Sequence, residues 1–326
     1  LSLFQFNLEI YTKYFTLPDF FMRRKQILLY DYFAQWIEVY KDGAVRERTL
    51  EKYWLSYRHL KQIAPGLKLV DVSRLEYQQI LNEFAKTHEK ATTMDFHHQL
   101  KAMLLDAYDE GYLKRDPTRK IVVKGKTPTE KKTKYLNEFE LKLLLRHLDL
   151  SKFPNFDWLI LIIAKTGLRF GEALGLTKKD IDLEGQTINV DKTWDYKNYA
   201  GGFKPTKNAS SIRKVSIDWK LAMQLNRVTQ DFPEDQPLFV QKRVFNSTIN
   251  NLLQRYCEEL DIPVISVHGL RHTHASLLLF AGVSIASVAK RLGHADMTTT
   301  QQTYLHIIQE LENKDNSKIM QHLASL

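Results

Sequence analysis

Three histidines and one arginine fall within seven residues late in the chain, in the stretch HGLRHTHASLLL that begins at His268. His268 and His272 are four residues apart, the spacing that puts two imidazoles on one helical face and that zinc hydrolases use. Such enzymes also carry a glutamate directly after the first histidine, but Gly269 stands there and the stretch contains no acidic residue. Arg271 would repel a divalent cation. The pattern therefore favours a site that binds an anion, and we expect neither a bound metal nor another cofactor.

A phosphate group suits these side chains. His268 and Arg271 are three residues apart, so both can face one group, and a guanidinium offers a planar fork of donors to phosphate oxygens. Upstream, Gly167-Leu168-Arg169 places a second arginine at a predicted helix start, with Glu172 one turn later. The stretch therefore predicts a site that neutralises phosphate with two arginines.

Two further polar residues follow at helix boundaries. SIASVAKRLGH predicts a short helix that has Ser284 as its N-cap and ends at Gly293. His294 follows directly after this helix end. The next predicted helix carries Tyr304, with Thr298 as its expected N-cap. Each of these residues alone could be structural, so their weight comes from their occurrence together.

Composition supports a polyanionic partner. The 326-residue chain carries a formal net charge of +9, which favours nucleic acid, with an anionic membrane surface as the alternative. The longest apolar run, WLILIIA, is far too short to span a bilayer. The single cysteine excludes an intramolecular disulfide and agrees with a reducing interior, so we expect a cytoplasmic protein.

A short basic stretch separates two predicted domains. Between 114 and 134 the chain has nine lysines and arginines against two acidic residues, broken by Pro117, Gly125 and Pro128. It could be a solvated linker, a strap lying on a phosphate backbone, or both. The expected DNA-backbone contacts are Lys120, Lys124, Lys126, Lys131, Lys132 and Lys134.

Hydrophobic periodicity predicts mostly helices on either side of this stretch. Before it we expect four helices, the second beginning after Thr49 and the third capped by Ser73. After it we expect helices around a few short strands, which are QTINVDKTW, a segment near Phe203 and IRKVSID. The predicted segments are an unassigned segment over 1–24, a helical DNA-binding domain over 25–117, a basic linker over 118–134, a catalytic domain over 135–312 and a tail helix over 313–326.

Three stretches together resemble the tyrosine recombinases, or phage-type integrases. They are TGLRFGEALGLTKKDID, HGLRHTHASLLLFAGVSIASVAKRLGH and TTTQQTYLHI, and the helical region ending AYDEGYLKRDP is similar to the family's core-binding domain. The resemblance implies a mainly α fold with a small antiparallel β-sheet. A SAM-like helical bundle and an α/β catalytic domain of the DNA breaking-rejoining type would close around DNA as a C-shaped clamp.

The resemblance also implies a reaction. A tyrosine attacks a phosphodiester, giving a 3′-phosphotyrosyl intermediate and a free 5′-hydroxyl, and no ATP is needed because the phosphoester bond energy is conserved. Carried over, Arg169 and Arg271 hold the non-bridging oxygens, His268 helps to position and deprotonate, His294 binds the phosphate and Tyr304 is the nucleophile. Glu172 and His272 are expected to support them.

The general acid is expected on a lysine between two strands. Lys207 precedes Ser211 by four residues and Arg213 by six, as in the family's KTxSSxR-like hairpin. Asn208 stands where the family usually has threonine, so Lys204 is the alternative.

The implied protein is a recombinase of a phage or of an integrative or conjugative element, active at the nucleoid of a bacterial host. It would assemble as a tetramer on two double-stranded DNA sites, with accessory directionality proteins. The tail helix would pack on its own domain or, as we favour, on the next protomer. The alternatives are a type IB topoisomerase, an inactive DNA-binding regulator and a metal-dependent nuclease. The chain begins with leucine and shows no arm-binding domain, so we expect it to be part of a longer protein.

Overall fold

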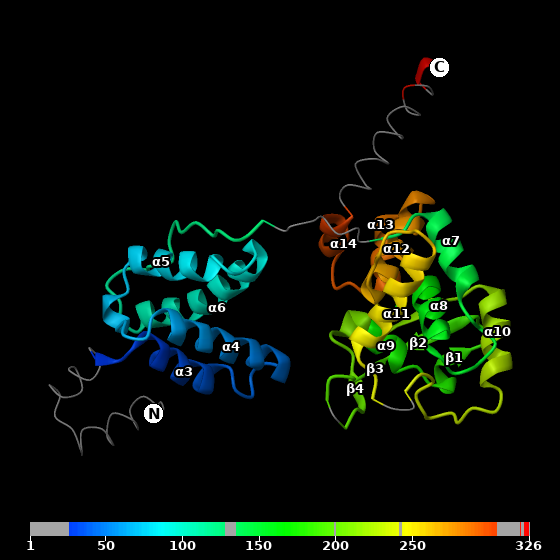
Figure 1. The fold of residues 1–326 in the computed structure, drawn as a ribbon, viewed down its shortest axis with the longest axis horizontal. Helices are drawn as coiled ribbons and strands as arrows, with labels where there is room; N and C mark the ends of the chain where they lie inside the picture. Colours follow the sequence, from blue (N-terminus) through cyan, green and yellow to red (C-terminus); the bar gives the residue numbers. More distant parts are fainter. Residues whose placement is uncertain are drawn as a thin grey trace. The chain divides into compact units, whose positions relative to one another are not determined.

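A computed structural model describes residues 26–127, 135–198, 200–240 and 243–304, together with 320 and 323–325. These residues form two compact units, which precede and follow the undescribed residues 128–134 in the sequence (Figure 1). The segment predicted over 1–24 and almost all of the predicted tail lie outside the described residues. In the described part, no helix is long and apolar enough to cross a membrane.

In its described residues, the first unit is a bundle of four helices around one apolar core. The core contains aromatic and aliphatic side chains from every helix, including Phe33, Leu60, Tyr77 and Leu100. Ser73 begins the third helix with a capping box, in which its hydroxyl accepts from the Glu76 amide and the Glu76 carboxylate accepts from the Ser73 amide. The helices are α3 (Leu29–Tyr40), α4 (Glu47–Ile63), α5 (Arg74–Ala85) and α6 (Lys90–Asp109), with a 3₁₀ turn at Leu69–Asp71.

The first half of the basic stretch lies against this bundle. Gln78 of α5 holds Val122 through two hydrogen bonds of 2.8 Å, one to its carbonyl and one from its amide. The Lys126 amide donates to the His88 carbonyl at 2.8 Å. A Cβ at Gly125 would lie 2.1 Å from the Lys90 amide nitrogen, so only glycine allows this close approach. The backbone at Val122, Gly125 and Lys126 thus lies against α5, the start of α6 and the loop between them.

The second unit combines eight described helices with five short strands. Its buried helix α8 packs most extensively against α12, and the core around them is rich in leucine and isoleucine. The helices are α7 (Glu138–His147), α8 (Phe156–Thr166), α9 (Phe170–Leu174), α10 (Trp219–Thr229), α11 (Asn246–Glu259), α12 (Val267–Phe280), α13 (Ile285–Leu292) and α14 (Met297–Thr303).

The strands form two small antiparallel sheets. One has the order β1-β2-β5 and the other pairs β3 with β4. The strands are β1 (Ile181–Asp182), β2 (Thr187–Val190), β3 (Lys192–Trp194), β4 (Phe203–Pro205) and β5 (Arg213–Ser216). The stretch QTINVDKTW, predicted as one strand, is therefore two strands that divide at Asp191 and join different sheets. The predicted fold class, mainly α with a small antiparallel sheet, is confirmed.

Two predicted helix starts are wrong. α4 begins at Glu47, before Thr49, since Arg46 is the extended residue that precedes it. Asp296, and not Thr298, caps α14, because its carboxylate accepts from the Thr299 amide at 3.0 Å. An ionised carboxylate at a helix N-terminus also interacts favourably with the helix dipole. Ser284 and Gly293 bound α13 as predicted.

Candidate active site

The ends of two helices hold the two predicted phosphate-binding arginines. α8 ends at Gly167 and α13 ends at Gly293, both in the left-handed conformation with φ of 69° and 68°. A Cβ at Gly167 would lie 2.7 Å from the His274 ring, and one at Gly293 would lie 2.9 Å from the Arg213 guanidinium. Both positions therefore require glycine, for conformation and for space.

Arg271 is buried between these helix ends. Its side chain comes from α12, and its Nη1 and Nη2 each donate to a carbonyl at 2.7 Å, those of Gly167 and Leu292. Only 3% of the residue is exposed. Burial, followed by the neighbouring Arg169, lowers the pKa of Arg271 to about 9, which still leaves it cationic at pH 7. Carbonyls at helix C-termini lack intrahelical partners and carry partial negative charge, so they suit a cation.

Arg169 contacts one of these two helix ends. It immediately precedes α9, and its Nη2 donates to the Gly293 carbonyl at 2.9 Å. Its Nη1 pairs with Glu172 at 2.6 Å and reaches the Ser211 hydroxyl at 3.3 Å. The guanidinium is partly exposed, unlike that of Arg271. Neighbouring helix ends thus hold both arginines.

Glu172 balances more than one cation. It is 2% exposed, and its second oxygen accepts from Arg213 at 2.9 Å. Burial alone would raise the pKa of Glu172, but Arg213 and Arg169 outweigh it, so the pKa is lowered and the carboxylate stays ionised at neutral pH. One carboxylate therefore sets the positions of two arginines.

A fourth arginine, Arg291, contacts His274 of α12. Arg291 donates to the Nε2 of His274 at 2.8 Å, while the Nδ1 of that ring lies 2.9 Å from the Ala164 carbonyl. Nε2 must accept and Nδ1 must donate, which defines a neutral tautomer. Burial, followed by Arg291, lowers the pKa of His274 to about 4, in agreement with that assignment. His274 is a structural residue.

His268 and His294 carry their charge poorly in this environment. Partial burial, then Arg271 and Arg169, lowers the pKa of His268, whose residue still reaches the surface. The same three causes lower the pKa of His294 to about 4, and its Nδ1 lies 2.7 Å from the Thr300 hydroxyl. Both rings are therefore neutral at pH 7 in the DNA-free protein.

Tyr304 lies against α12, directly after α14. It is 2% exposed and belongs to a small apolar cluster with Ala275 and Leu292. Its hydroxyl lies 2.9 Å from the Nδ1 of His272. Burial raises the pKa of Tyr304 to about 12, although the charge of Arg271 acts in the opposite direction. His272, predicted only as a supporting residue, thus contacts the predicted nucleophile.

The two candidate lysines lie in different surroundings. Lys204 is on β4 and pairs with Asp195 at 2.6 Å. Lys207 is exposed in the loop between β4 and β5. This loop leads directly to Ser211, which is buried and contacts Arg169. The placement favours Lys207 as the lysine that serves this site.

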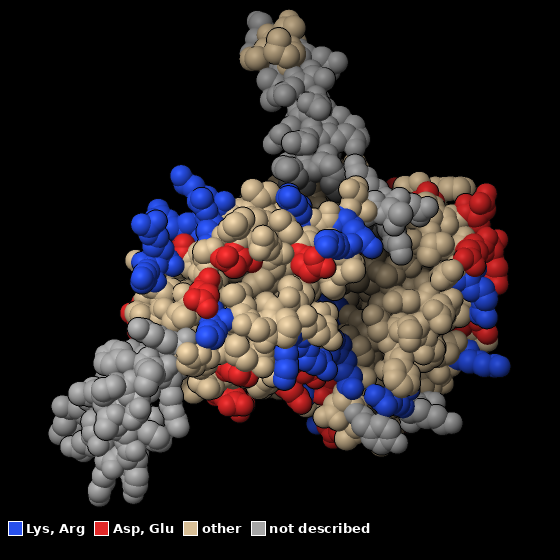
Figure 2. Space-filling model, turned by 60° about the vertical axis from the view of Figure 1, so that its left-hand side comes forward, with Lys and Arg blue, Asp and Glu red and all other residues tan. Residues whose placement is uncertain are grey.

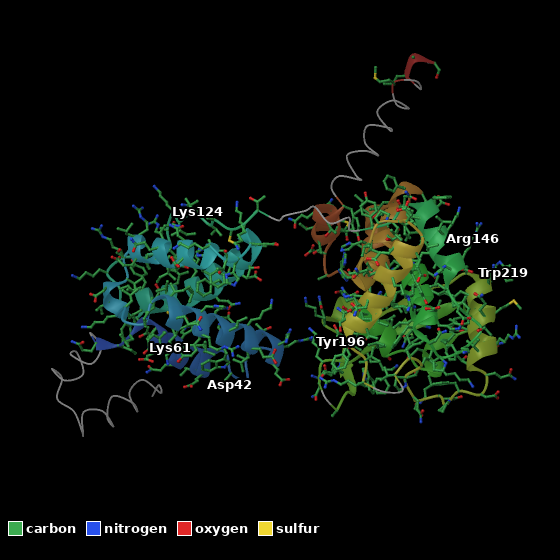
Figure 3. The ribbon with its side chains drawn as sticks, viewed as in Figure 1. Asp42, Lys61, Lys124, Arg146, Tyr196 and Trp219 are labelled. Atoms are coloured by element: carbon green, nitrogen blue, oxygen red, sulfur yellow. The ribbon has the colours of Figure 1, made fainter. Side chains whose placement is uncertain are left out.

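The three described DNA-backbone candidates lie in the first unit. Lys124 and Lys126 are on the segment that lies against α5 and the start of α6, and Figure 3 shows Lys124 beside α5. Lys120 lines a groove of about 1100 Å³ in the same unit. Lys131, Lys132 and Lys134 lie outside the described residues.

The groove is basic. Its cationic residues are exposed, whereas Asp116 accepts from the amide and hydroxyl of Thr118. On the face drawn in Figure 2, lysine and arginine side chains and acidic side chains both occur in small groups among neutral residues. The groove is lined by Arg74, Lys114, Arg115, Arg119 and Lys120 against Asp71 and Asp116.

Sequence reasoning gave no role to Arg74, Arg213 or Arg291, and it gave Arg115 and Arg119 a role only as part of the basic stretch. The spacing of Arg213 from Lys207 was visible, but its partner Glu172 lies 41 positions earlier and is revealed only by the fold. In the described part of the chain, no three histidine, cysteine, aspartate or glutamate side chains gather as possible metal ligands.

The chain is similar to known integrases. The integrase of Staphylococcus phage L54a is 32% identical over 173 residues, covering 48% of this chain and 49% of that protein. The chain thus spans about half the length of that relative. The Tn1549 transposon integrase, solved with a circular intermediate DNA, has a TM-score of 0.72 at 20% identity, covering 85% of this chain and 94% of that chain.

A second solved structure shares the fold. The lambda integrase tetramer bound to a Holliday junction has a TM-score of 0.64 at 16% identity and covers 90% of this chain and 86% of that chain. The model of the phage integrase family matches residues 134–310, more than half of the chain and nearly all of the second unit. The chain therefore belongs to the phage integrase family.

Proposed function

We propose that the protein is a site-specific tyrosine recombinase that cuts and rejoins DNA to integrate or excise a mobile element. The observation that carries the proposal is a pair of arginines, Arg169 and Arg271, that donate to carbonyls at the ends of α8 and α13. The helix that carries Arg271, α12, also contacts Tyr304 through His272. This arrangement offers a phosphate two fixed cations next to a phenol.

The site holds more positive than negative charge. Arg169 and Arg213 share one carboxylate, Glu172, whereas the guanidinium of Arg271 donates to two neutral carbonyls. Helix-end carbonyls orient a guanidinium without cancelling its charge. The remaining charge favours the trigonal-bipyramidal phosphorane-like transition state, where an additional negative charge develops on the phosphoryl oxygens.

Each proposed residue has one part in the reaction. Arg169 and Arg271 bind the non-bridging oxygens of the scissile phosphate, and His268 and His294 flank it as neutral hydrogen-bonding groups. The oxygen of Tyr304 bonds to phosphorus as the bond to the 5′ oxygen breaks, leaving a 3′-phosphotyrosyl ester. Lys207 gives its proton to the departing 5′ oxygen.

The first unit supplies affinity for double-stranded DNA. The exposed cations of its groove, together with Lys124 and Lys126, are suited to phosphate contacts that carry no sequence information by themselves. The Tn1549 integrase was solved on DNA, which supports the same class of substrate here. The proposed substrate places the protein with the nucleoid of its host.

We extend the proposal to assembly. The lambda integrase forms a tetramer on a Holliday junction, and a tetramer on two sites would allow paired strand exchange here. The predicted tail helix over 313–326 would then dock on the next protomer. Accessory proteins that set the direction of the reaction would act on this assembly.

A nicked suicide substrate tests the proposal. A duplex carrying the attachment site, with a nick just 3′ to the cleavage position, loses the short 5′-hydroxyl fragment after cleavage and traps the covalent adduct. We expect a denaturant-resistant protein–DNA adduct that EDTA does not prevent and that Tyr304→Phe abolishes. An adduct surviving Tyr304→Phe, or no adduct at all, would contradict the proposal. Relaxation of supercoils without recombinant products would instead indicate a topoisomerase.

A further inference from the structure

The Tyr304 hydroxyl has a defined partner on α12. The Nδ1 of His272 lies 2.9 Å from it, and the two rings meet at 63° with centroids 5.8 Å apart. His272 follows Arg271 directly in the sequence, so one helix presents a phosphate-binding guanidinium and the partner of the nucleophile at adjacent positions. This contact is a hydrogen bond to the atom that reacts.

Tyr304 cannot easily lose its proton to solvent. With 2% of the residue exposed, bulk water has little access to the phenol. Burial also raises the pKa of Tyr304 to about 12, so the phenol is protonated at neutral pH. A phenol must release its proton to become an effective nucleophile, and a nearby protein group is needed to accept it.

The other candidate acceptors are engaged differently. His294 turns its Nδ1 to Thr300, and both terminal nitrogens of Arg271 donate to carbonyls. His268 packs edge-on against His272, with the ring centroids 4.8 Å apart and an interplanar angle of 88°. The hydrogen bond described for the Tyr304 hydroxyl joins it to His272, whose ring nitrogen can accept a proton.

We propose that His272 is a catalytic residue that takes the phenolic proton of Tyr304, an inference that rests on the proposed recombinase function. In strand cleavage, the O–H bonding pair of Tyr304 becomes the pair that forms the new O–P bond, and the proton moves to the Nδ1 of His272. The P–O5′ bond breaks toward the 5′ oxygen, which takes a proton from Lys207. Rejoining reverses each transfer, and the imidazolium returns its proton to the phenol.

The proposal fixes the tautomer of His272. Nδ1 must be unprotonated to accept from the phenol, so the neutral ring carries its hydrogen on Nε2. Asparagine can place an amide oxygen near the position of Nδ1, and it can accept a hydrogen bond but cannot take a full proton. His272→Asn therefore keeps the hydrogen bond that positions the tyrosine and removes the group that can take its proton.

The decisive experiment measures single-turnover cleavage of the nicked suicide substrate at saturating DNA and pH 7. We expect His272→Asn to cleave about 100-fold to 1,000-fold more slowly than the wild type, with unchanged DNA binding, as for loss of a general base. A residue that only positions Tyr304 would keep nearly full activity as asparagine. Cleavage by His272→Asn within threefold of the wild type would overturn the inference.

A sulfur-substituted substrate separates the base from the acid. A 5′-bridging phosphorothiolate has a leaving group that needs no proton, so we expect it to restore cleavage by Lys207→Ala. The same substrate should leave His272→Asn slow, since the defect lies in the nucleophile. Restoration of His272→Asn to the wild-type rate would assign His272 to the leaving-group side and contradict the inference.

A further variant, His272→Ala, tests the inference if asparagine at position 272 disturbs the fold. Should His272→Asn bind DNA weakly, His272→Ala is assayed with added imidazole, which supplies a base without repairing the fold. Imidazole-dependent cleavage that still requires Tyr304 supports the inference, and its absence counts against it. The proposed function is tested separately, because a wild-type adduct lost in Tyr304→Phe but undiminished in His272→Asn removes only the role of His272.

Discussion

The protein holds positive charge in two contrasting ways. In the second unit, Arg271 is buried and the side chain of Arg213 is 6% exposed, and each donates to oxygen atoms at helix ends or of Glu172. In the first unit, the cations that line the groove, such as Arg115 and Arg119, are exposed to solvent. One set of charges is rigid, and the other can rearrange.

This difference separates catalysis from affinity. Charges fixed before the reaction stabilise a transition state without having to reorganise, which is how preorganised sites accelerate chemistry. Exposed lysines and arginines act through counterion release, which strengthens binding to any phosphate backbone and depends steeply on salt. Substitutions in the two regions should therefore change different measured quantities.

The largest expected effect is on stability. Glu172→Gln removes the buried carboxylate that Arg169 and Arg213 share, so both guanidiniums lose their anionic partner. We expect a loss of about 3–5 kcal/mol in the free energy of unfolding. The exposed pair of Arg48 and Glu51 is the control, and Glu51→Gln should cost less than about 1 kcal/mol. Urea titrations measure the stability of both variants, and equal losses would show that the buried carboxylate contributes no more than the exposed one.

The same carboxylate gives a pH dependence. The folded-state pKa of Glu172 is lowered below its ordinary value of 4.5, so its contribution to stability is present above pH 4.5 and is lost as the pH falls through the lower folded-state value. Urea titrations from pH 7 to pH 3 should show a steeper loss for the wild type than for Glu172→Gln. Parallel curves would contradict this assignment.

The next effect concerns rate. A lysine at position 271 has one nitrogen and cannot reach the Gly167 and Leu292 carbonyls in the same forked geometry, so we expect Arg271→Lys to slow cleavage about 100-fold to 1,000-fold at saturating DNA. The matched control is Arg146→Lys on α7, an exposed arginine, which should cleave at the wild-type rate (Figure 3). A normal rate for Arg271→Lys would show that charge alone suffices.

A smaller loss is expected at the exposed edge of the site. Lys207→Ala should cleave a normal phosphodiester about 100-fold more slowly, because it removes the proposed proton donor. Lys204→Ala is the comparison, since Lys204 already pairs with Asp195, and we expect a change of less than threefold. Rapid-quench measurements on both variants decide between the lysines, and a larger defect in Lys204→Ala would reverse the assignment.

The smallest effects belong to the groove. Arg115→Gln and Arg119→Gln should each weaken DNA binding a few-fold, equally for cognate and unrelated DNA, and lower the slope of log Kd against log salt by about one. Arg48→Gln serves as the control, because Glu51 already pairs with that guanidinium. A sequence-specific loss would show that the groove reads bases.

Local signals predicted the helix boundaries better than the contacts between helices. Ser73, Ser284 and Gly293 act within a few residues of their own positions, so sequence alone located them. The division at Asp191 was missed because β2 and β3 follow each other without a break in composition and join different partners. Asp296 outcompeted Thr298 as a cap through its own carboxylate, a choice that depends on the backbone after His294.

The candidate site shows the same limit of local information. The residue types at 169, 268, 271, 294 and 304 were visible as motifs, whereas their mutual geometry depends on two helix ends meeting. His272 was predicted only as a supporting residue because its contact with Tyr304 spans 32 positions. Residues 121–127 looked like linker because the hydrogen bonds of Gln78 to Val122 span 44 positions.

The way Arg271 is buried has a thermodynamic consequence for the whole molecule. A cation removed from water and held by neutral carbonyls costs free energy that folding must supply, and a bound anion would recover part of it. Any oxyanion that binds the folded state and not the unfolded chain raises the melting temperature by mass action. Sulfate or vanadate should therefore raise the melting temperature of the wild type, at constant ionic strength, more than that of Arg271→Lys. The recombination site would then report its occupancy through the stability of the fold, even without DNA.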